Sequence, residues 1–222
     1  MSDREGSSRL LVKICGLREP EHAAWAAQQG ADLLGFVFAP SRRQVTAQAA
    51  RRCIEAARDV APKVRAVGVF VDSSPDHVRM IADEAGLDLI QLHGSKPTPT
   101  AAARAQGVVR AIRPRPEQSE DDVLGEVRRW TNGTPSPEYL LVDAYHPIAA
   151  GGTGEVANWV MAERVARAWP TLLAGGLTPA NVASAIAAVR PAGVDVSSGV
   201  ERDGAKDPDL IAAFIAAARA AG

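Results

Sequence analysis

The sequence predicts an α/β protein, a (β/α)8 barrel of the TIM type. Short runs of β-branched and aliphatic residues alternate with alanine-rich amphipathic stretches along the chain, as in consecutive βα units. Several strand runs, such as GFVF at 35–38 and YLLV at 139–142, are apolar throughout, which is typical of strands buried on both faces. Eight such pairs in 222 residues leave about 28 residues for each, enough for a strand, a short helix and two loops.

The strands can be assigned from these apolar runs. We expect them, in chain order, at Leu10–Ile14, Leu33–Phe38, Arg65–Val71, Leu87–Leu92, Val108–Ile112, Tyr139–Asp143, Thr171–Ala174 and Val194–Ser197. A doubly wound open sheet is the competing architecture. It usually carries a G-x-G-x-x-G turn after the first strand, whereas this chain has CGLREPE at 15–21, so the closed barrel is favoured.

The helices between the strands are marked by start and stop signals. Capping residues or prolines precede four of them, at Pro20, Ser73-Ser74-Pro75, Thr178-Pro179 and Asp207-Pro208. Glycines mark three expected helix ends, at Gly30, Gly86 and Gly107.

Composition limits the possible partners and predicts one domain over residues 1–222, with residues 1–9 as a flexible extension. The 25 basic residues are dispersed and the net charge is −1, which argues against nucleic acid and in favour of a small-molecule ligand. The chain shows neither a signal peptide nor an apolar run long enough for a membrane span, so we expect a cytoplasmic protein. A disulfide is not expected, and a monomer and a homodimer fit equally well.

In a barrel of this type, the active site forms where the strands end, so the residues there are the candidates for function. Glycine-rich loops follow the last two strands, AGGL at 174–177 and SSGVE at 197–201. Backbone N–H groups in such loops can approach phosphate oxygens closely, and these two loops commonly hold phosphate in barrels. Each loop alone also fits a plain tight turn. Together they predict a phosphate site, for which the candidates are Gly175, Gly176, Ser198 and Gly199.

Two strand-end side chains can transfer protons, Cys15 and Asp143. A lone cysteine is more often packed than catalytic, but Cys15 lies at a strand end, and the nearby Lys13 would raise its thiolate fraction. Cys53 lies in a helical run and is expected to be packing. Asp143 closes an apolar strand, where burial would raise its pKa and make it a general acid; a loop-stapling aspartate is equally consistent with this position.

Other polar groups at the strand ends are candidate ligand contacts. Arg43 could pair with a carboxylate or phosphate, although an exposed arginine is also common. Gln91 and His93 end the fourth strand, where His93 has either a structural or a ligand-contacting role. No metal is expected, because His22, His77, His93 and His146 have neither ligand spacing nor a cysteine cluster beside them.

Taken in order, eight segments resemble the phosphoribosylanthranilate isomerase family, and together they extend over nearly all of the chain after residue 9. They are VKICGL at 12–17, GADLLGFVF at 30–38, VGVFVD at 67–72, IQLHG at 90–94, LLVDAYHP at 140–147, GGTG at 151–154, LAGGLTPANV at 173–182 and VDVSSGVE at 194–201.

The resemblance implies a cofactor-free Amadori rearrangement of N-(5-phosphoribosyl)anthranilate in tryptophan biosynthesis. It makes Asp143 the general acid on the ribose ring oxygen and Cys15 the general base at C2′. It also implies that Arg43 binds the anthranilate carboxylate and that Asp195 binds the ribose hydroxyls. The phosphate would be bound by Gly176, Ser198 and Gly199.

The chain departs from the family pattern at two places. It has Glu155 and Asn158 where the family usually has Lys and Asp, which leaves open how the loop after the sixth strand closes, with its glycines at 151, 152 and 154. It also has Ser41-Arg42-Arg43 where the pattern is commonly Ser-Pro-Arg, so either arginine could hold the carboxylate.

Two other functions remain as alternatives. One is the related histidine-pathway isomerase, whose two-aspartate design fits a cysteine at the first strand end less well. The other is a non-catalytic phosphate-binding barrel.

Overall fold

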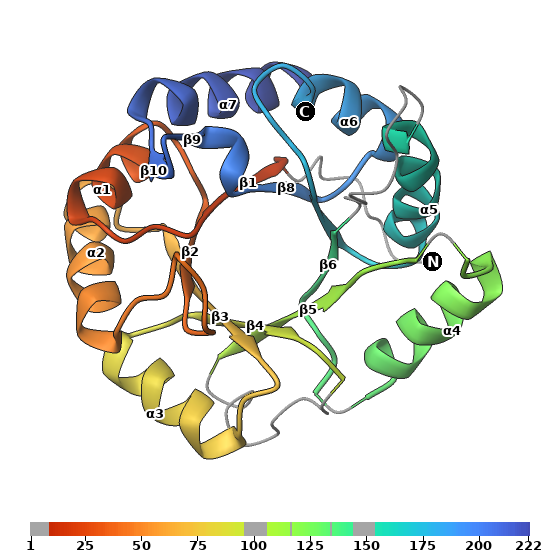
Figure 1. The fold of residues 1–222 in the computed structure, drawn as a ribbon, viewed down its shortest axis with the longest axis horizontal. Helices are drawn as coiled ribbons and strands as arrows, with labels where there is room; N and C mark the ends of the chain where they lie inside the picture. Colours follow the sequence, from red (N-terminus) through yellow and green to blue (C-terminus); the bar gives the residue numbers. More distant parts are fainter. Residues whose placement is uncertain (1–8, 96–105, 116, 134, 144–153) are drawn as a thin grey trace.

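The eight predicted strands form one closed parallel barrel, in which neighbours in the chain are neighbours in the sheet. The computed structural model describes residues 9–95, 106–115, 117–133, 135–143 and 154–222. The strands are β1 (Leu11–Cys15), β2 (Leu33–Val37), β3 (Arg65–Val71), β4 (Leu89–His93), β5 (Gly107–Ile112), β6 (Tyr139–Asp143), β7 (Thr171–Ala174) and β8 (Gly193–Val196). Strand β8 pairs back onto β1, which closes the ring (Figure 1). The predicted fold class is therefore confirmed, and each strand lies within two residues of its expected position.

Helices surround this barrel as an outer ring (Figure 1). In the described part of the chain they are α1 (Pro20–Gln28), α2 (Ala47–Val60), α3 (Pro75–Ala85), α4 (Glu120–Thr131), α5 (Gly154–Ala168), α6 (Val182–Val189) and α7 (Pro208–Ala221). The helix expected between β4 and β5 falls on residues 96–105, outside the described ranges. After β8, a single 3-10 turn (Ser198–Val200) leads into a small antiparallel hairpin of β9 (Glu201–Arg202) and β10 (Ala205–Lys206).

Most of the predicted helix boundaries are confirmed by their capping geometry. Pro20, Pro75 and Pro208 each occupy the first turn of a helix, where the missing N–H costs nothing. The Asp207 carboxylate accepts hydrogen bonds from the backbone N–H groups of Asp209 and Leu210. Gly30 and Gly86 follow α1 and α3 with positive φ, as expected for helix ends.

One boundary prediction was wrong. Helix α6 begins at Val182, not at Thr178-Pro179, because Thr178 to Asn181 form a separate turn in which the Asn181 side chain accepts a hydrogen bond from Thr178 N at 2.8 Å. Gly107 is the first residue of β5; the helix expected before it falls on residues 96–105, outside the described ranges, so its end stays a prediction.

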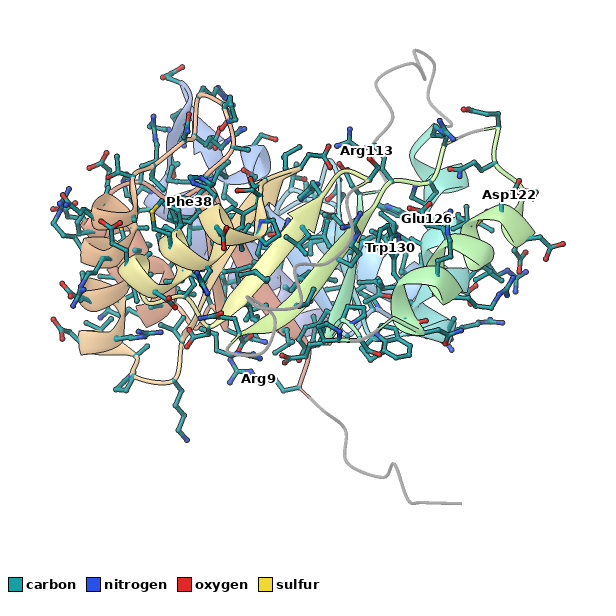
Figure 2. The ribbon with its side chains drawn as sticks, turned by 90° about the horizontal axis from the view of Figure 1, so that it is seen from below. Arg9, Phe38, Arg113, Asp122, Glu126 and Trp130 are labelled. Atoms are coloured by element: carbon teal, nitrogen blue, oxygen red, sulfur yellow. The ribbon has the colours of Figure 1, made fainter. Side chains whose placement is uncertain are left out.

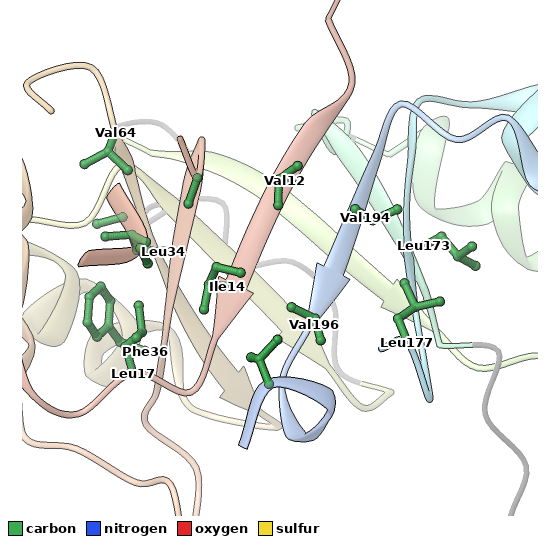
Figure 3. Close-up of a cluster of buried hydrophobic side chains, with 14 of the residues drawn as sticks. Val12, Ile14, Leu17, Leu34, Phe36, Val64, Leu173, Leu177, Val194 and Val196 are labelled. Atoms are coloured by element: carbon green, nitrogen blue, oxygen red, sulfur yellow. The ribbon is translucent and has the colours of Figure 1, made fainter. Parts of the chain in front are cut away.

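Alternation along the strands creates two apolar layers. The barrel interior is filled by Leu33, Val67, Leu89, Val109, Ala111, Leu141, Leu172 and Ala174. The residues between them in sequence face outward against the helices; on β1 and β2 these include Val12, Ile14, Leu34 and Phe36 (Figure 3). Each fully buried aliphatic side chain of this kind stabilises the fold by about 1.5–3 kcal/mol. Cys53 lies in this outer layer, which agrees with its predicted packing role.

Candidate active site

The inward-facing side chains change from apolar to polar towards the carboxyl ends of the strands. Cys15 on β1, His93 on β4 and Asp143 on β6 share the inward side with the apolar residues below them, because successive side chains of a strand alternate between its two faces. Above the apolar layer is an open cavity of about 660 Å³. Figure 2 shows the two ends of the barrel, with Arg9 before β1 at one rim and Arg113 after β5 at the other.

All of the predicted site residues line this one cavity. They are Cys15, Arg43, Gln91, His93, Asp143, Gly175, Gly176, Asp195, Ser198 and Gly199. Arg113, Ser41 and Ser197 also line it, whereas Arg42 does not. The chemical groups expected from the sequence are therefore within reach of a single small ligand.

Cys15 lies beside a buried ion pair. The register of β1 against β8 sets Lys13 opposite Asp195, and Lys13 Nζ lies 2.9 Å from Asp195 Oδ1. Gly35 lies opposite Cys15 on β2, and a Cβ there would come within 2.7 Å of the Cys15 sulfur. Glycine at this position therefore leaves room for the thiol.

The protonation of Cys15 depends on two opposing effects. Burial raises the pKa of the Cys15 thiol, and the Lys13 ammonium acts to lower it. Burial is the larger effect, so the pKa lies above the ordinary thiol value. Lys13 thus acts in the direction predicted from the sequence, but burial has the stronger effect.

Gln91 and His93 form a pair on β4. Gln91 Nε2 lies 2.7 Å from His93 Nε2. Burial, with a further contribution from the Lys13 charge, lowers the pKa of His93 to about 4, so its ring is neutral at pH 7. Gln91 is only 2% exposed, and its Oε1 has no hydrogen-bond partner among the described residues. That oxygen is available to accept a hydrogen bond from a ligand in the cavity.

Asp143 is paired with an arginine of the neighbouring strand end. Arg113 Nε donates to Asp143 Oδ2 at 3.0 Å, and Arg113 Nη2 donates to the same oxygen. The Asp143 side chain is 19% exposed and has this cationic partner. A ligand that engages Asp143 must therefore share it with Arg113 or displace Arg113.

The two glycine-rich loops pack directly against each other. Gly175 and Gly176 have φ of 95° and 64°, a region that favours glycine. A Cβ on Gly199 would lie 1.8 Å from the carbonyl oxygen of Leu177, which no side chain could tolerate. The loops after β7 and β8 therefore form one joined surface at the cavity.

Sequence reasoning missed a buried ion cluster behind Arg43. Arg43 donates from Nε to Glu201 Oε1 at 2.7 Å and from Nη2 to Glu201 Oε2 at 2.9 Å. Burial acts to raise the pKa of Glu201, but hydrogen bonds from Arg43 and Lys206 outweigh it and bring the pKa to about 2. Glu201 is the last residue of SSGVE, but only Ser198 and Gly199 of that motif were given a function.

Several other predictions concern metals, membranes and the loop after β6. Within the described ranges, no group of three or more His, Cys, Asp or Glu side chains is arranged to hold a metal ion. In the same part of the chain, no helix is long and apolar enough to cross a membrane. The glycines at 151 and 152 and the side chains of Glu155 and Asn158 lie outside what the structure describes, whereas Gly154 is the first residue of α5.

The closed barrel and its polar cavity at the strand ends define the class of the protein, a (β/α)8-barrel enzyme. A family model described as N-(5′phosphoribosyl)anthranilate (PRA) isomerase matches residues 12–217. The chain therefore belongs to the phosphoribosylanthranilate isomerase family, as its motifs predicted.

Individual relatives support the same assignment. The chain is 48% identical to the N-(5′-phosphoribosyl)anthranilate isomerase of Roseiflexus castenholzii over 96% of this chain and 99% of the relative. It is 43% identical to that of Desulforudis audaxviator, over 95% and 98%. Among solved structures, the Thermotoga maritima isomerase superimposes with a TM-score of 0.79 at 35% identity, covering 95% of this chain and 99% of that one.

Proposed function

We propose that this chain converts N-(5′-phosphoribosyl)anthranilate into 1-(2-carboxyphenylamino)-1-deoxyribulose 5-phosphate, a step of tryptophan biosynthesis. The observation that carries the proposal is the meeting of the Cys15 thiol and the Asp143 carboxylate in one cavity with the two joined glycine loops. A related isomerase has been crystallised in complex with reduced 1-(o-carboxyphenylamino)-1-deoxyribulose 5-phosphate, a reduced form of this product.

The reaction needs two main proton transfers. Asp143, in its protonated form, gives a proton to the ribose ring oxygen while the C1′–O bond breaks and the amine nitrogen forms a C=N bond to C1′. The Cys15 thiolate then removes the proton from C2′. The electrons of that C–H bond form a C1′=C2′ double bond, and the C=N pair returns to nitrogen. The resulting enol becomes the ketone when C1′ takes up a proton and the C2′ hydroxyl loses one, so no atoms are lost and no cofactor is consumed.

The remaining cavity residues would bind the substrate. Its phosphate suits the backbone of the two glycine loops, at Gly175, Gly176, Ser198 and Gly199. Arg43 rather than Arg42 would hold the anthranilate carboxylate, since only Arg43 lines the cavity. Asp195 would accept hydrogen bonds from ribose hydroxyls beside its ion pair with Lys13.

Gln91 and His93 complete the contacts. The buried Gln91 Oε1 offers an acceptor for a substrate N–H or O–H group. His93, being neutral, would contact the substrate without adding a charge to the cavity.

The proton-transfer roles are tested by Cys15→Ala and Asp143→Asn, assayed on freshly made phosphoribosylanthranilate. We expect each to lower kcat by about 10²–10⁴-fold, the usual contribution of a positioned general acid or base. Cys53→Ala is the matched control, because it removes the other buried thiol from the outer layer, and it should retain activity. Near-normal turnover by either site variant would refute the role of that residue.

The alternatives are separated by the same preparation. The histidine-pathway substrate should not be turned over, and a chain that binds the reduced product without catalysis would be the non-catalytic barrel. The oligomeric state, monomer or homodimer, remains a prediction that sedimentation would test. The Thermotoga maritima relative is described as dimeric. The cytoplasmic location also remains a prediction.

A further inference from the structure

Arg43 is held by a carboxylate that does not itself line the cavity. Its two bonds to Glu201 form a parallel fork in which two guanidinium nitrogens meet both carboxylate oxygens. The third nitrogen, Nη1, has no hydrogen-bond partner among the described residues. The stem of Arg43 passes close to Gly16, where a Cβ would lie 2.6 Å from Arg43 Cδ. The side chain is therefore restricted at its stem and at its head.

Glu201 is in turn held by a second cation. Lys206 Nζ lies 2.9 Å from Glu201 Oε1 and 2.8 Å from the carbonyl oxygen of Ser197. The hairpin register sets Lys206 directly opposite Glu201, and the two side chains are only 4% and 5% exposed. Arg42 adds a bond to Glu201 from the solvent side, with 60% of its own side chain exposed.

The charges of this cluster favour an anionic ligand. Three cations surround one carboxylate, so a net positive charge remains beside the cavity wall that Arg43 forms. A guanidinium that is already fixed also loses less conformational freedom on binding than a mobile one.

We infer that Glu201, held by Lys206, is a positioning residue for substrate recognition, which fixes the Arg43 guanidinium so that its remaining N–H groups meet the carboxylate of the anthranilate ring. This inference rests on the proposed function. It adds a determinant of specificity from the hairpin after β8, 158 residues along the chain from Arg43.

The test measures binding of two ligands by calorimetry. One is reduced 1-(o-carboxyphenylamino)-1-deoxyribulose 5-phosphate, and the other is its phenylamino counterpart without the ring carboxylate. Glu201→Gln should weaken the first about fivefold to tenfold, the cost of immobilising one long side chain, and leave the second unchanged. Tighter or equal binding of the first ligand would overturn the inference, because it would mean that Glu201 only offsets the charge of Arg43.

A second variant separates position from charge. Glu201→Asp keeps the negative charge but is too short to keep both bonds to Arg43 and the bond to Lys206. Glu201→Asp should show the same loss of affinity for the ligand that carries the ring carboxylate. It therefore tests the inference even if Glu201→Gln does not fold. Wild-type affinity for both ligands in a folded Glu201→Asp variant would likewise overturn the inference.

Two further variants identify the cause of a negative result. Glu138→Gln removes the carboxylate of another forked pair, Arg65–Glu138, at the amino ends of the strands, and should change neither affinity. Arg43→Met should weaken only the ligand that carries the carboxylate. If it does not, the role given to Arg43 in the proposed function is wrong; if it does while both Glu201 variants bind normally, only the inference about Glu201 is wrong.

Discussion

His93 illustrates how the barrel changes the chemistry of a single side chain. In water its ring would be half protonated near pH 6.5, but burial next to the Lys13 ammonium lowers its pKa to about 4. Beside a cavity proposed to bind an anion, one would expect a charged histidine. The ring is instead neutral and bonded to Gln91, so Arg43 and Arg113 supply the positive charge that lines the cavity.

This shift predicts a pH dependence of stability. Between pH 6.5 and pH 4 the unfolded chain binds a proton at His93 that the folded chain does not, so stability falls as the pH falls through this window. Comparing urea unfolding at pH 7 and pH 5, wild type should lose about 2 kcal/mol more than His93→Asn. His77→Asn, which changes an exposed histidine, should behave like wild type. Equal losses in wild type and His93→Asn would show that His93 titrates normally.

At the scale of elements, the contact between the two glycine loops makes them one unit. The chain after β8 lies against the carbonyl of Leu177 at Gly199, with no space for a single extra carbon. A change in either loop must therefore displace the other, and with it the whole proposed phosphate site.

Gly199→Ala tests this coupling. Because the added carbon would overlap Leu177 O, we expect the loops to separate and the specificity constant kcat/KM to fall by about 10²-fold, as for a misplacement of about 1 Å. Gly125→Ala on α4 is the control, since a Cβ there meets only the end of the Arg128 side chain at 3.9 Å. Unchanged kinetics in Gly199→Ala would mean that these loops do not hold the phosphate.

The elements also show what could be predicted from the sequence. Strand positions were predictable because a strand buried on both faces must be apolar over its length. The proposed site residues could then be chosen because active sites of such barrels form where the strands end, and all of them line the one cavity. The start of α6 could not be predicted in this way. The Asn181 side chain closes a local turn at Thr178, and the residues of this turn also fit the beginning of a helix. Nor could the Lys13–Asp195 and Arg43–Glu201 pairs be predicted, since their partners meet only when the last strand closes onto the first.

At the scale of the whole molecule, the closure of the barrel is stabilised by a separate set of hydrogen bonds from Arg219. Arg219 on α7 donates from Nη2 to Asp32 Oδ2 and to Gly30 O, both at 2.6 Å, and from Nη1 to Leu10 O. The same Asp32 oxygen accepts a bond from the backbone N–H of Val12 at 2.8 Å. One arginine thus ties the last helix to the beginnings of the first two strands.

Arg219→Met should therefore lower the free energy of unfolding by about 1.5–3 kcal/mol, the range for hydrogen bonds to charged groups. In a chain of this size the melting temperature should fall by about 2–4 °C per kcal/mol. Arg51→Met is the control, because it removes an exposed pair with Glu55 on one helix and should cost less than about 1 kcal/mol. A loss in Arg219→Met no larger than in the control would show that closure does not depend on this residue.

The contact of α7 with the beginnings of β1 and β2 also brings the two ends of the described chain together. A Cβ built on Gly222 would lie 2.7 Å from the side chain of Leu10, so the last residue touches the first residues of the barrel. A ring of eight units joined in this way has no structural beginning. The order in which the ribosome makes the units is then only one of several linear orders that give the same ring. If a short peptide joined the two ends, a circularly permuted chain could begin in another surface loop and form the same barrel.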